Sequence, residues 1–139
     1  CTDHVRPYSG VPEAVAMLKQ AGVKIAVLTN KPNEFVSKIL EACYPAGSFD
    51  AMLGQTERFP TKPNPESLFY LMEQRQIPKD AKGAYAGDSD VDIKTAKNAG
   101  LISISCAWGF RPKEQLLPLH PDYLIETGND LQTLLDKLL

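Results

Sequence analysis

AYAGDSDVDIKTAKNAG, residues 84–100, joins a run of small residues to a helical pattern that is closed by a glycine. The small residues predict a buried strand over 83–87, and the following pattern predicts a helix over 90–99. A strand that leads directly into a helix is typical of parallel α/β sheets. Three carboxylates stand at alternate positions where the strand ends and the helix begins: Asp88, Asp90 and Asp92.

Helix and strand patterns alternate along the rest of the chain. Apolar residues at helical spacing predict helices over 10–22, 33–43, 64–74 and 131–138. Apolar runs predict strands at 23–29, 51–54, 101–107 and 123–126. We therefore predict an α/β protein with a three-layer, Rossmann-like, doubly wound parallel sheet that forms one domain.

Composition sets the outer bounds on function. The 139 residues are 43% hydrophobic and carry a formal charge of -2, which predicts a soluble globular domain without a basic surface for nucleic acid. Apolar runs are too short for a membrane span, which needs about 20 residues. Three widely spaced cysteines, Cys1, Cys43 and Cys106, favour free thiols over a disulfide framework. These features predict a cytoplasmic protein.

Polar residues follow the predicted strands at the sheet edge where sites of parallel sheets form. Thr29 and Asn30 end one strand, Asp88 ends another, and Lys62 lies in the intervening loop FPTKPNPE. A hydroxyl, an amide, an ammonium and carboxylates suit an anion held beside a metal ion. Each residue alone also has an ordinary explanation, as a turn residue, a solvated lysine or a first-turn acid.

The three aspartates also match the first three ligands of an EF-hand calcium loop. The match ends at Ile93, where that loop needs glycine, and at Ala99, where it needs a bidentate glutamate. An EF-hand is therefore excluded.

The order of the motifs TNKP, KPNPE, GDSDVDIKTAKNAG and AWGFR resembles the haloacid dehalogenase superfamily, in its phosphoglycolate phosphatase branch. The similarity runs from about Arg6 to the C-terminus. It implies a Mg²⁺-dependent phosphatase that hydrolyses a small phosphorylated metabolite, such as phosphoglycolate, through an aspartyl-phosphate. Residues 1–139 would then be the C-terminal part of the core domain, without the family's helical cap.

The resemblance also implies roles for single residues. Thr29 and Asn30 would donate hydrogen bonds to the phosphoryl group, and Lys62 would neutralise its charge. Asp88 would bind Mg²⁺, and Asp92 would either bind the ion through water or hold Lys62 in place. The family pattern does not require Asp90, for which we expect a helix-capping or supporting role. Ser89 and Arg111 are further candidates for supporting or substrate-contacting residues, although for Arg111 we favour a solvated side chain.

One family motif is missing. The nucleophile motif D-x-D-x-T/V, which ends the family's central first strand, is absent from the chain. The only D-x-D triplets lie within residues 88–92, which already match another family motif. Without that strand the two strands on either side of it have unpaired edges. They could pair directly, another chain could supply the strand through self-association, or the parent polypeptide could be longer. We expect the last, and expect these 139 residues alone to be inactive.

Two other classes of function remain open at this stage. The chain could be a non-catalytic phosphate- or metal-binding remnant, which would bind Mg²⁺ without turnover. A phospho-acceptor receiver domain also combines acids, a threonine and a lysine on such a sheet, but its acidic residues come first in the chain, whereas here they come last.

Overall fold

The computed structural model describes residues 9–55, 60–108 and 112–139, apart from the side chains of 30–34, 36 and 55. The chain forms two compact units. We call Cys1–Phe59 with Gly128–Leu139 the β1–β2 unit and Pro60–Thr127 the β3–β5 unit, and describe each by itself.

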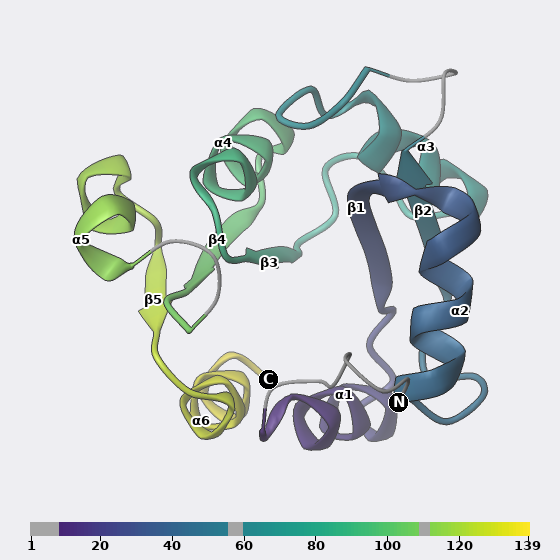
Figure 1. Ribbon diagram of the computed structural model, residues 1–139, viewed down its shortest axis with the longest axis horizontal. Helices are drawn as coiled ribbons and strands as arrows, with labels where there is room; N and C mark the ends of the chain where they lie inside the picture. The colour runs from purple at the N-terminus through teal and green to yellow at the C-terminus, as the bar shows by residue number, and fades with distance from the viewer. Residues whose placement is uncertain (1–8, 56–59, 109–111) are drawn as a thin grey trace. The chain divides into compact units, whose positions relative to one another are not determined.

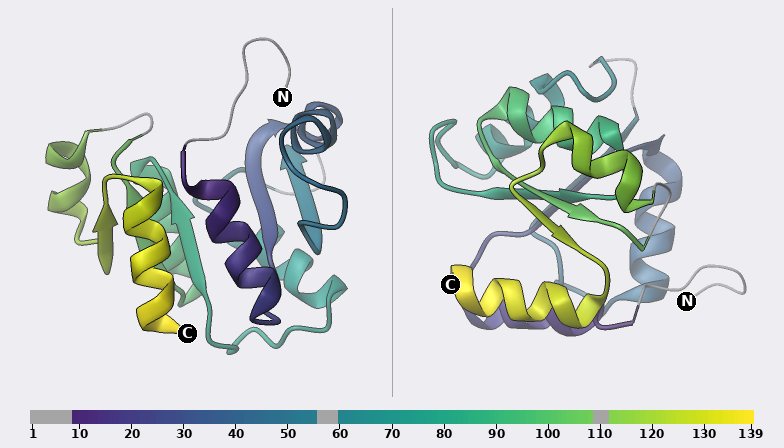
Figure 2. Two further views of the ribbon diagram at one scale, coloured as in Figure 1. Left: turned by 90° about the horizontal axis from the view of Figure 1, so that it is seen from below. Right: turned by 90° about the vertical axis from the view of Figure 1, so that its left-hand side faces the viewer.

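The β1–β2 unit contains two parallel strands and three helices. Its elements are α1 (Val11–Gln20), β1 (Ala26–Pro32), α2 (Asn33–Cys43), β2 (Ala51–Gln55) and α6 (Gly128–Leu138). Helices α1 and α6, from opposite ends of the chain, lie side by side (Figure 2). Their starts approach so closely that a Cβ added to Gly128 would lie 2.0 Å from the carbonyl oxygen of Ser9. Only glycine fits at this position.

The β3–β5 unit is a three-stranded parallel sheet in the order β3-β4-β5 (Figure 1). Its elements are α3 (Glu66–Gln74), β3 (Ala84–Gly87), α4 (Asp90–Ala99), β4 (Ile102–Cys106), α5 (Lys113–Leu116), the 3-10 helix η1 (Leu117–Leu119) and β5 (Tyr123–Ile125). Helix α4 packs on β3 and β4. Its buried face meets the central strand through Ile93, Ala96 and Ala99.

An aspartate fixes the start of the outer strand in each unit. Asp50, directly before β2, accepts a hydrogen bond of 2.7 Å from the backbone N–H of Ile25. Asp122, directly before β5, accepts one of 2.8 Å from Ser103. Each carboxylate thus extends the backbone ladder by one bond beyond the strand itself.

These observations confirm the predicted α/β class with parallel strands, and the predicted elements are present. The sheet differs in one respect. Among the described residues β1 pairs only with β2, and β3 pairs only with β4, so the chain forms two sheets rather than one. Helix α5 and η1 were not predicted, because KEQLLPL is too short for a clear helical period.

Strand β1 also differs from the sequence prediction. It begins three residues later than expected and extends to Pro32, with an irregular register between Leu28 and Pro32. The apolar run predicted burial on both faces, yet Ala26 is exposed and Val27 and Leu28 are only half-buried. A strand with one neighbour lacks part of the surface that would bury it. No described helix is long and apolar enough to cross a membrane.

Candidate active site

Asp92 is the centre of the candidate site, and its position follows from the local sequence. Ser89 is the N-cap of α4, and its hydroxyl accepts a hydrogen bond from the Asp92 backbone N–H while Asp92 bonds back to the cap, forming a capping box. Oδ2 of Asp92 accepts from the backbone N–H groups of Asp88 (3.1 Å) and Ser89 (3.3 Å). The first turn of α4 therefore fixes one carboxylate oxygen.

Gly87 makes room for this carboxylate. A Cβ at Gly87 would lie 2.2 Å from Cγ of Asp92, which no side chain tolerates. The glycine at the end of β3 therefore serves a close approach between strand and side chain. It is the structural reason for the Gly-Asp-x-x-x-Asp spacing seen in the sequence.

Lys62 binds the second oxygen of the same carboxylate. Its Nζ lies 2.6 Å from Oδ1 of Asp92, and the two side chains are 12% and 10% exposed. A buried ion pair of this kind is strongly destabilised when one partner is removed. Thus a loop lysine, a residue type that is usually solvated, is held in a nearly buried position.

Tyr85 lies against both members of the pair. Its ring centroid is 5.7 Å from Nζ of Lys62, within the range of a cation–π interaction, and its hydroxyl is 3.5 Å from Oδ1 of Asp92. Burial, reinforced by the charge of Asp92, raises the pKa of the Tyr85 hydroxyl. The hydroxyl therefore stays protonated at neutral pH.

The loop that carries Lys62 is anchored to the helices on either side. Asn98, in the last turn of α4, donates a hydrogen bond of 2.9 Å from Nδ2 to the carbonyl of Pro63. The side chain of Asn64 accepts a hydrogen bond of 2.9 Å from the backbone N–H of Glu66, although the N-cap of α3 is Pro65 and not Asn64. The Lys62–Pro63 peptide bond is cis.

Asp88 and Asp90 follow β3 and begin α4. The charge of Asp88, together with that of Asp92, adds to the burial that raises the pKa of the Cys106 thiol to about 12. Asp88 follows Gly87, which pairs with Ser105 near the end of β4. Asp90 lies in the first turn of α4, 4.0 Å from Nζ of Lys94, and its side chain is 39% exposed. Ser89, rather than Asp90, is the capping residue.

The other predicted site residues belong elsewhere. Thr29 lies in β1, in the β1–β2 unit, and it is half-buried. The backbone of Asn30 continues the same strand, but its side chain is not among those described. Arg111 lies outside the described residues.

The cysteines divide between the two units. Cys106 is buried and free, as predicted. Cys43 corrects the prediction of free thiols, because it is disulfide-bonded.

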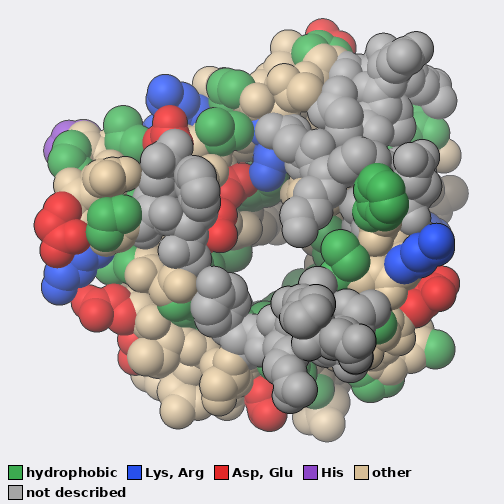
Figure 3. All heavy atoms as spheres, viewed as in Figure 1, with side chains coloured by type: hydrophobic (Ala, Val, Ile, Leu, Met, Phe, Trp, Pro, Cys, Tyr) green, Lys and Arg blue, Asp and Glu red, His purple; other side chains and the backbone are tan. Residues whose placement is uncertain are grey.

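The donor set permits a magnesium site of limited size. No described group of three or more His, Cys, Asp or Glu residues is arranged to hold a metal. Mg²⁺ is commonly bound by only one or two protein carboxylates together with water and substrate phosphate, so a larger group is not required. Both oxygens of Asp92 accept hydrogen bonds from the chain, and Asp88 follows the last residue of β3, where the sequence predicted a Mg²⁺ ligand. On the face shown in Figure 3, acidic and basic side chains of the described residues are interspersed.

Sequence reasoning missed Tyr85, Gly87 and Asn98 as parts of this site. A signal for the first two was present, since alternate residues of a strand share a face. Tyr85 therefore had to point to the same side as Gly87 and the start of α4. Asn98 gave no comparable signal, because its partner is a backbone carbonyl 35 residues away.

The fold and the site define a class of protein: a parallel α/β protein with a buried lysine–aspartate pair beside a strand's carboxyl end. The model of the haloacid dehalogenase-like hydrolase family matches residues 1–106. The chain belongs to this family.

Individual relatives agree with this assignment. A phosphoglycolate phosphatase from Vibrio parahaemolyticus is 39% identical over 125 residues, covering 89% of this chain and 54% of that protein. A protein from Caldanaerobacter subterraneus, provisionally named a pyrophosphatase, is 34% identical over 84% of this chain and 52% of its own length. A crystal structure from Lactobacillus delbrueckii, provisionally named a phosphoglycolate phosphatase, has a TM-score of 0.86 at 36% identity, covering 95% of this chain and 54% of that one. The chain spans about half the length of these relatives.

Proposed function

We propose that the complete protein is a phosphatase that hydrolyses small phosphomonoesters. One observation carries this proposal: the nearly buried Lys62–Asp92 pair beside Asp88, at the carboxyl end of β3, in a chain of this family. A fixed ammonium in a partly dehydrated position is suited to neutralising charge on a phosphoryl group. Electrostatic stabilisation of that kind supplies much of the rate in phosphoryl transfer.

The contacts favour one of the two roles expected for Asp92. Its carboxylate binds Lys62 through one oxygen and the cap of α4 through the other. We therefore assign Asp92 to holding Lys62, while Lys62 neutralises the phosphate. Thr29 and Asn30 remain our candidates for donors to the phosphoryl oxygens.

Mg²⁺ is the proposed cofactor, with Asp88 as its carboxylate ligand. When bound, the ion would neutralise phosphate charge together with Lys62.

Phosphoglycolate is our first candidate substrate, since the Vibrio parahaemolyticus relative bears that name. Pyrophosphate is the second, since the Caldanaerobacter subterraneus relative is provisionally named for it. Arg111 could bind a substrate carboxylate, which would favour the first.

A phosphatase of this family needs a nucleophilic aspartate in a D-x-D-x-T/V motif, and the chain has no such motif. We propose that residues 1–139 are the C-terminal part of the core domain of a longer, cytoplasmic polypeptide. By themselves they should not turn over substrate.

The test is expression of the complete reading frame beside the 139-residue chain. Both are assayed with 2-phosphoglycolate, pyrophosphate and a panel of sugar phosphates, in Mg²⁺ and in EDTA. We expect hydrolysis only by the complete protein and only with Mg²⁺. A complete protein that binds phosphate or Mg²⁺ but hydrolyses nothing would favour the non-catalytic remnant instead.

A further inference from the structure

The ion pair with Asp92 does not by itself explain why the side chain of Lys62 is fixed in a nearly buried position. A lysine side chain loses substantial rotamer freedom when it is fixed, and one hydrogen bond at its end is a weak restraint on so long a side chain. Yet Nζ lies 2.6 Å from Asp92 in a side chain that is only 12% exposed. Other residues must restrict both the ammonium and the backbone that carries it.

Helix α4 holds Lys62 at two points. In its first turn Asp92 binds the ammonium, and in its last turn Asn98 donates to the carbonyl of Pro63, the residue after Lys62. The two contacts fix opposite ends of one lysine from one rigid element. Asn98 itself touches neither the ammonium nor Asp92 in any described contact.

Strand β3 supplies a third restraint. Tyr85 is the one large side chain in the strand sequence AYAG, and its ring lies below the ammonium at 5.7 Å. The hydroxyl is 3.5 Å from Asp92, at the limit of a hydrogen bond, so the ring rather than the hydroxyl makes the substantial contact.

We propose that Tyr85 and Asn98 are positioning residues for Lys62: the Tyr85 ring restrains the ammonium, and Asn98 restrains its loop. The inference rests on the proposed function for its catalytic meaning, since a positioned ammonium matters only where a phosphoryl group is to be neutralised. Its physical content, the restraint of Lys62, is measurable without substrate.

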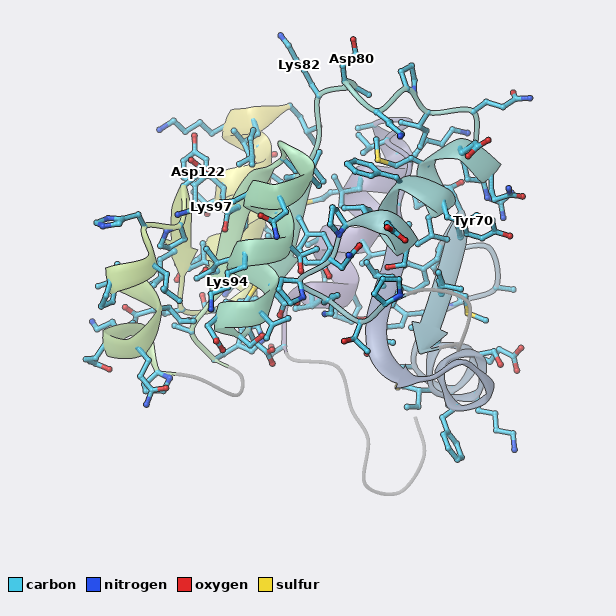
Figure 4. The ribbon with its side chains drawn as sticks, turned by 90° about the horizontal axis from the view of Figure 1, so that it is seen from above. Tyr70, Asp80, Lys82, Lys94, Lys97 and Asp122 are labelled. Carbon is cyan, nitrogen blue, oxygen red and sulfur yellow. The ribbon has the colours of Figure 1, made fainter. Side chains whose placement is uncertain are left out.

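The experiment measures acetylation of individual lysines in the folded 139-residue chain by an amine-reactive ester, followed by mass spectrometry. Lys94, which is 54% exposed and projects from α4 (Figure 4), is the internal reference. In the chain without substitutions we expect Lys62 to react about tenfold more slowly than Lys94, because the Lys62 side chain is nearly buried and is paired with Asp92. Equal rates would overturn the proposal at once.

Variants then separate the two restraints. Tyr85→Met keeps side-chain volume but removes the ring, and should raise the Lys62 rate about fivefold, whereas Tyr85→Phe should stay within about twofold of the parent. Asn98→Ala should raise the rate about threefold. The matched control is Lys97→Ala, which removes another side-chain hydrogen bond from α4 to a backbone carbonyl, that of Leu119 at the end of η1, and should leave the reactivity of Lys62 unchanged.

Unchanged Lys62 reactivity in both Tyr85→Met and Asn98→Ala would contradict the proposal. If Tyr85→Met unfolds, shown by loss of circular dichroism, the Asn98→Ala arm decides alone. In the complete protein, Tyr85→Met should lower kcat about tenfold with KM little changed, and Tyr85→Phe should restore kcat. If the complete protein hydrolyses no substrate, the proposed function is refuted. The restraint of Lys62 by Tyr85 and Asn98 is then judged from the acetylation rates alone.

Discussion

The two units differ in how completely their own residues pair and bury their strands. In the β3–β5 unit, four consecutive residues of β4 are buried, Ser103 to Cys106, because this strand has a neighbour on each side. In the β1–β2 unit, no described side chain of β1 or α2 is buried, and the buried apolar side chains lie in α1 and α6. The same α/β pattern thus gives a buried central strand in the β3–β5 unit and a partly exposed strand in the β1–β2 unit.

The candidate site divides along the same line. Lys62, Asp88 and Asp92 are arranged by contacts within the β3–β5 unit. Thr29 and Asn30 belong to the unit whose strand is half-covered. The contacts among Lys62, Asp88 and Asp92 are therefore made within the β3–β5 unit alone.

The largest stability effect should come from Gly87→Ala. The added methyl group would meet Cγ of Asp92 at 2.2 Å and force the carboxylate away from both Lys62 and the cap of α4. We expect a loss of about 3–5 kcal/mol in the free energy of unfolding, measured with urea. Gly83→Ala, just before the same strand, is the control, because its methyl would meet only a flexible leucine side-chain atom at 3.3 Å. Equal losses in the two variants would refute the close-approach argument.

A second prediction contrasts a buried with an exposed ion pair. Lys62→Met leaves the carboxylate of Asp92 without its cation and should cost about 2–4 kcal/mol of stability. Lys113→Met breaks the pair with Glu126, whose side chains are 48% and 59% exposed, and should cost under about 0.5 kcal/mol. Thermal unfolding of the two variants makes the comparison, and a Lys62→Met protein as stable as Lys113→Met would contradict it.

Hydrogen exchange compares the two units directly. The backbone amides of β4 should exchange more slowly than those of β1, by about tenfold or more, since β4 is paired on both edges and covered by buried side chains. Mass spectrometry of peptides from each strand provides the rates. Slower exchange in β1 would mean that the β1–β2 unit is the better ordered of the two.

The smallest effect concerns Asp50. The hydrogen bond from Ile25, aided by nearby Lys19, holds the pKa of the Asp50 carboxyl below its usual value. Its contribution to stability is therefore present above the pKa of the unfolded state and lost as pH falls through the lower pKa of the folded state. Asp50→Asn should cost about 1 kcal/mol near pH 6 and converge with the parent at lower pH. A constant difference across this range would refute the assignment.

Much of the fold was predictable because its signals are local. Helix α4 was predicted at its observed bounds, since its start, its Ser-Asp cap and its closing Gly100 all lie within eleven residues or so of one another. The division into two sheets and the partial exposure of β1 were not, because they depend on which strands are neighbours. The spacing of apolar residues within one segment does not indicate which strands lie beside it in the sheet.

The structure brings together two of the residues that were named from the sequence. Lys62 and Asp92 form an ion pair of 2.6 Å, the contact that one of the two roles offered for Asp92 requires, while the function of both residues stays a prediction. Tyr85 and Asn98 were missed because an aromatic residue in a strand and an amide in a helix are usually structural. Their partners become visible only when the loop of residues 60–65 is placed against α4.

The most direct test of the central claim compares Lys62→Met with Lys94→Met in the complete protein. Both substitutions remove an ammonium from the β3–β5 unit, but only Lys62 is buried against Asp92, whereas Lys94 is 54% exposed. The account predicts that kcat/KM for the phosphomonoester falls about 1,000-fold in Lys62→Met and changes by less than about twofold in Lys94→Met, with both variants folded. Near-parental turnover by a folded Lys62→Met protein would contradict it.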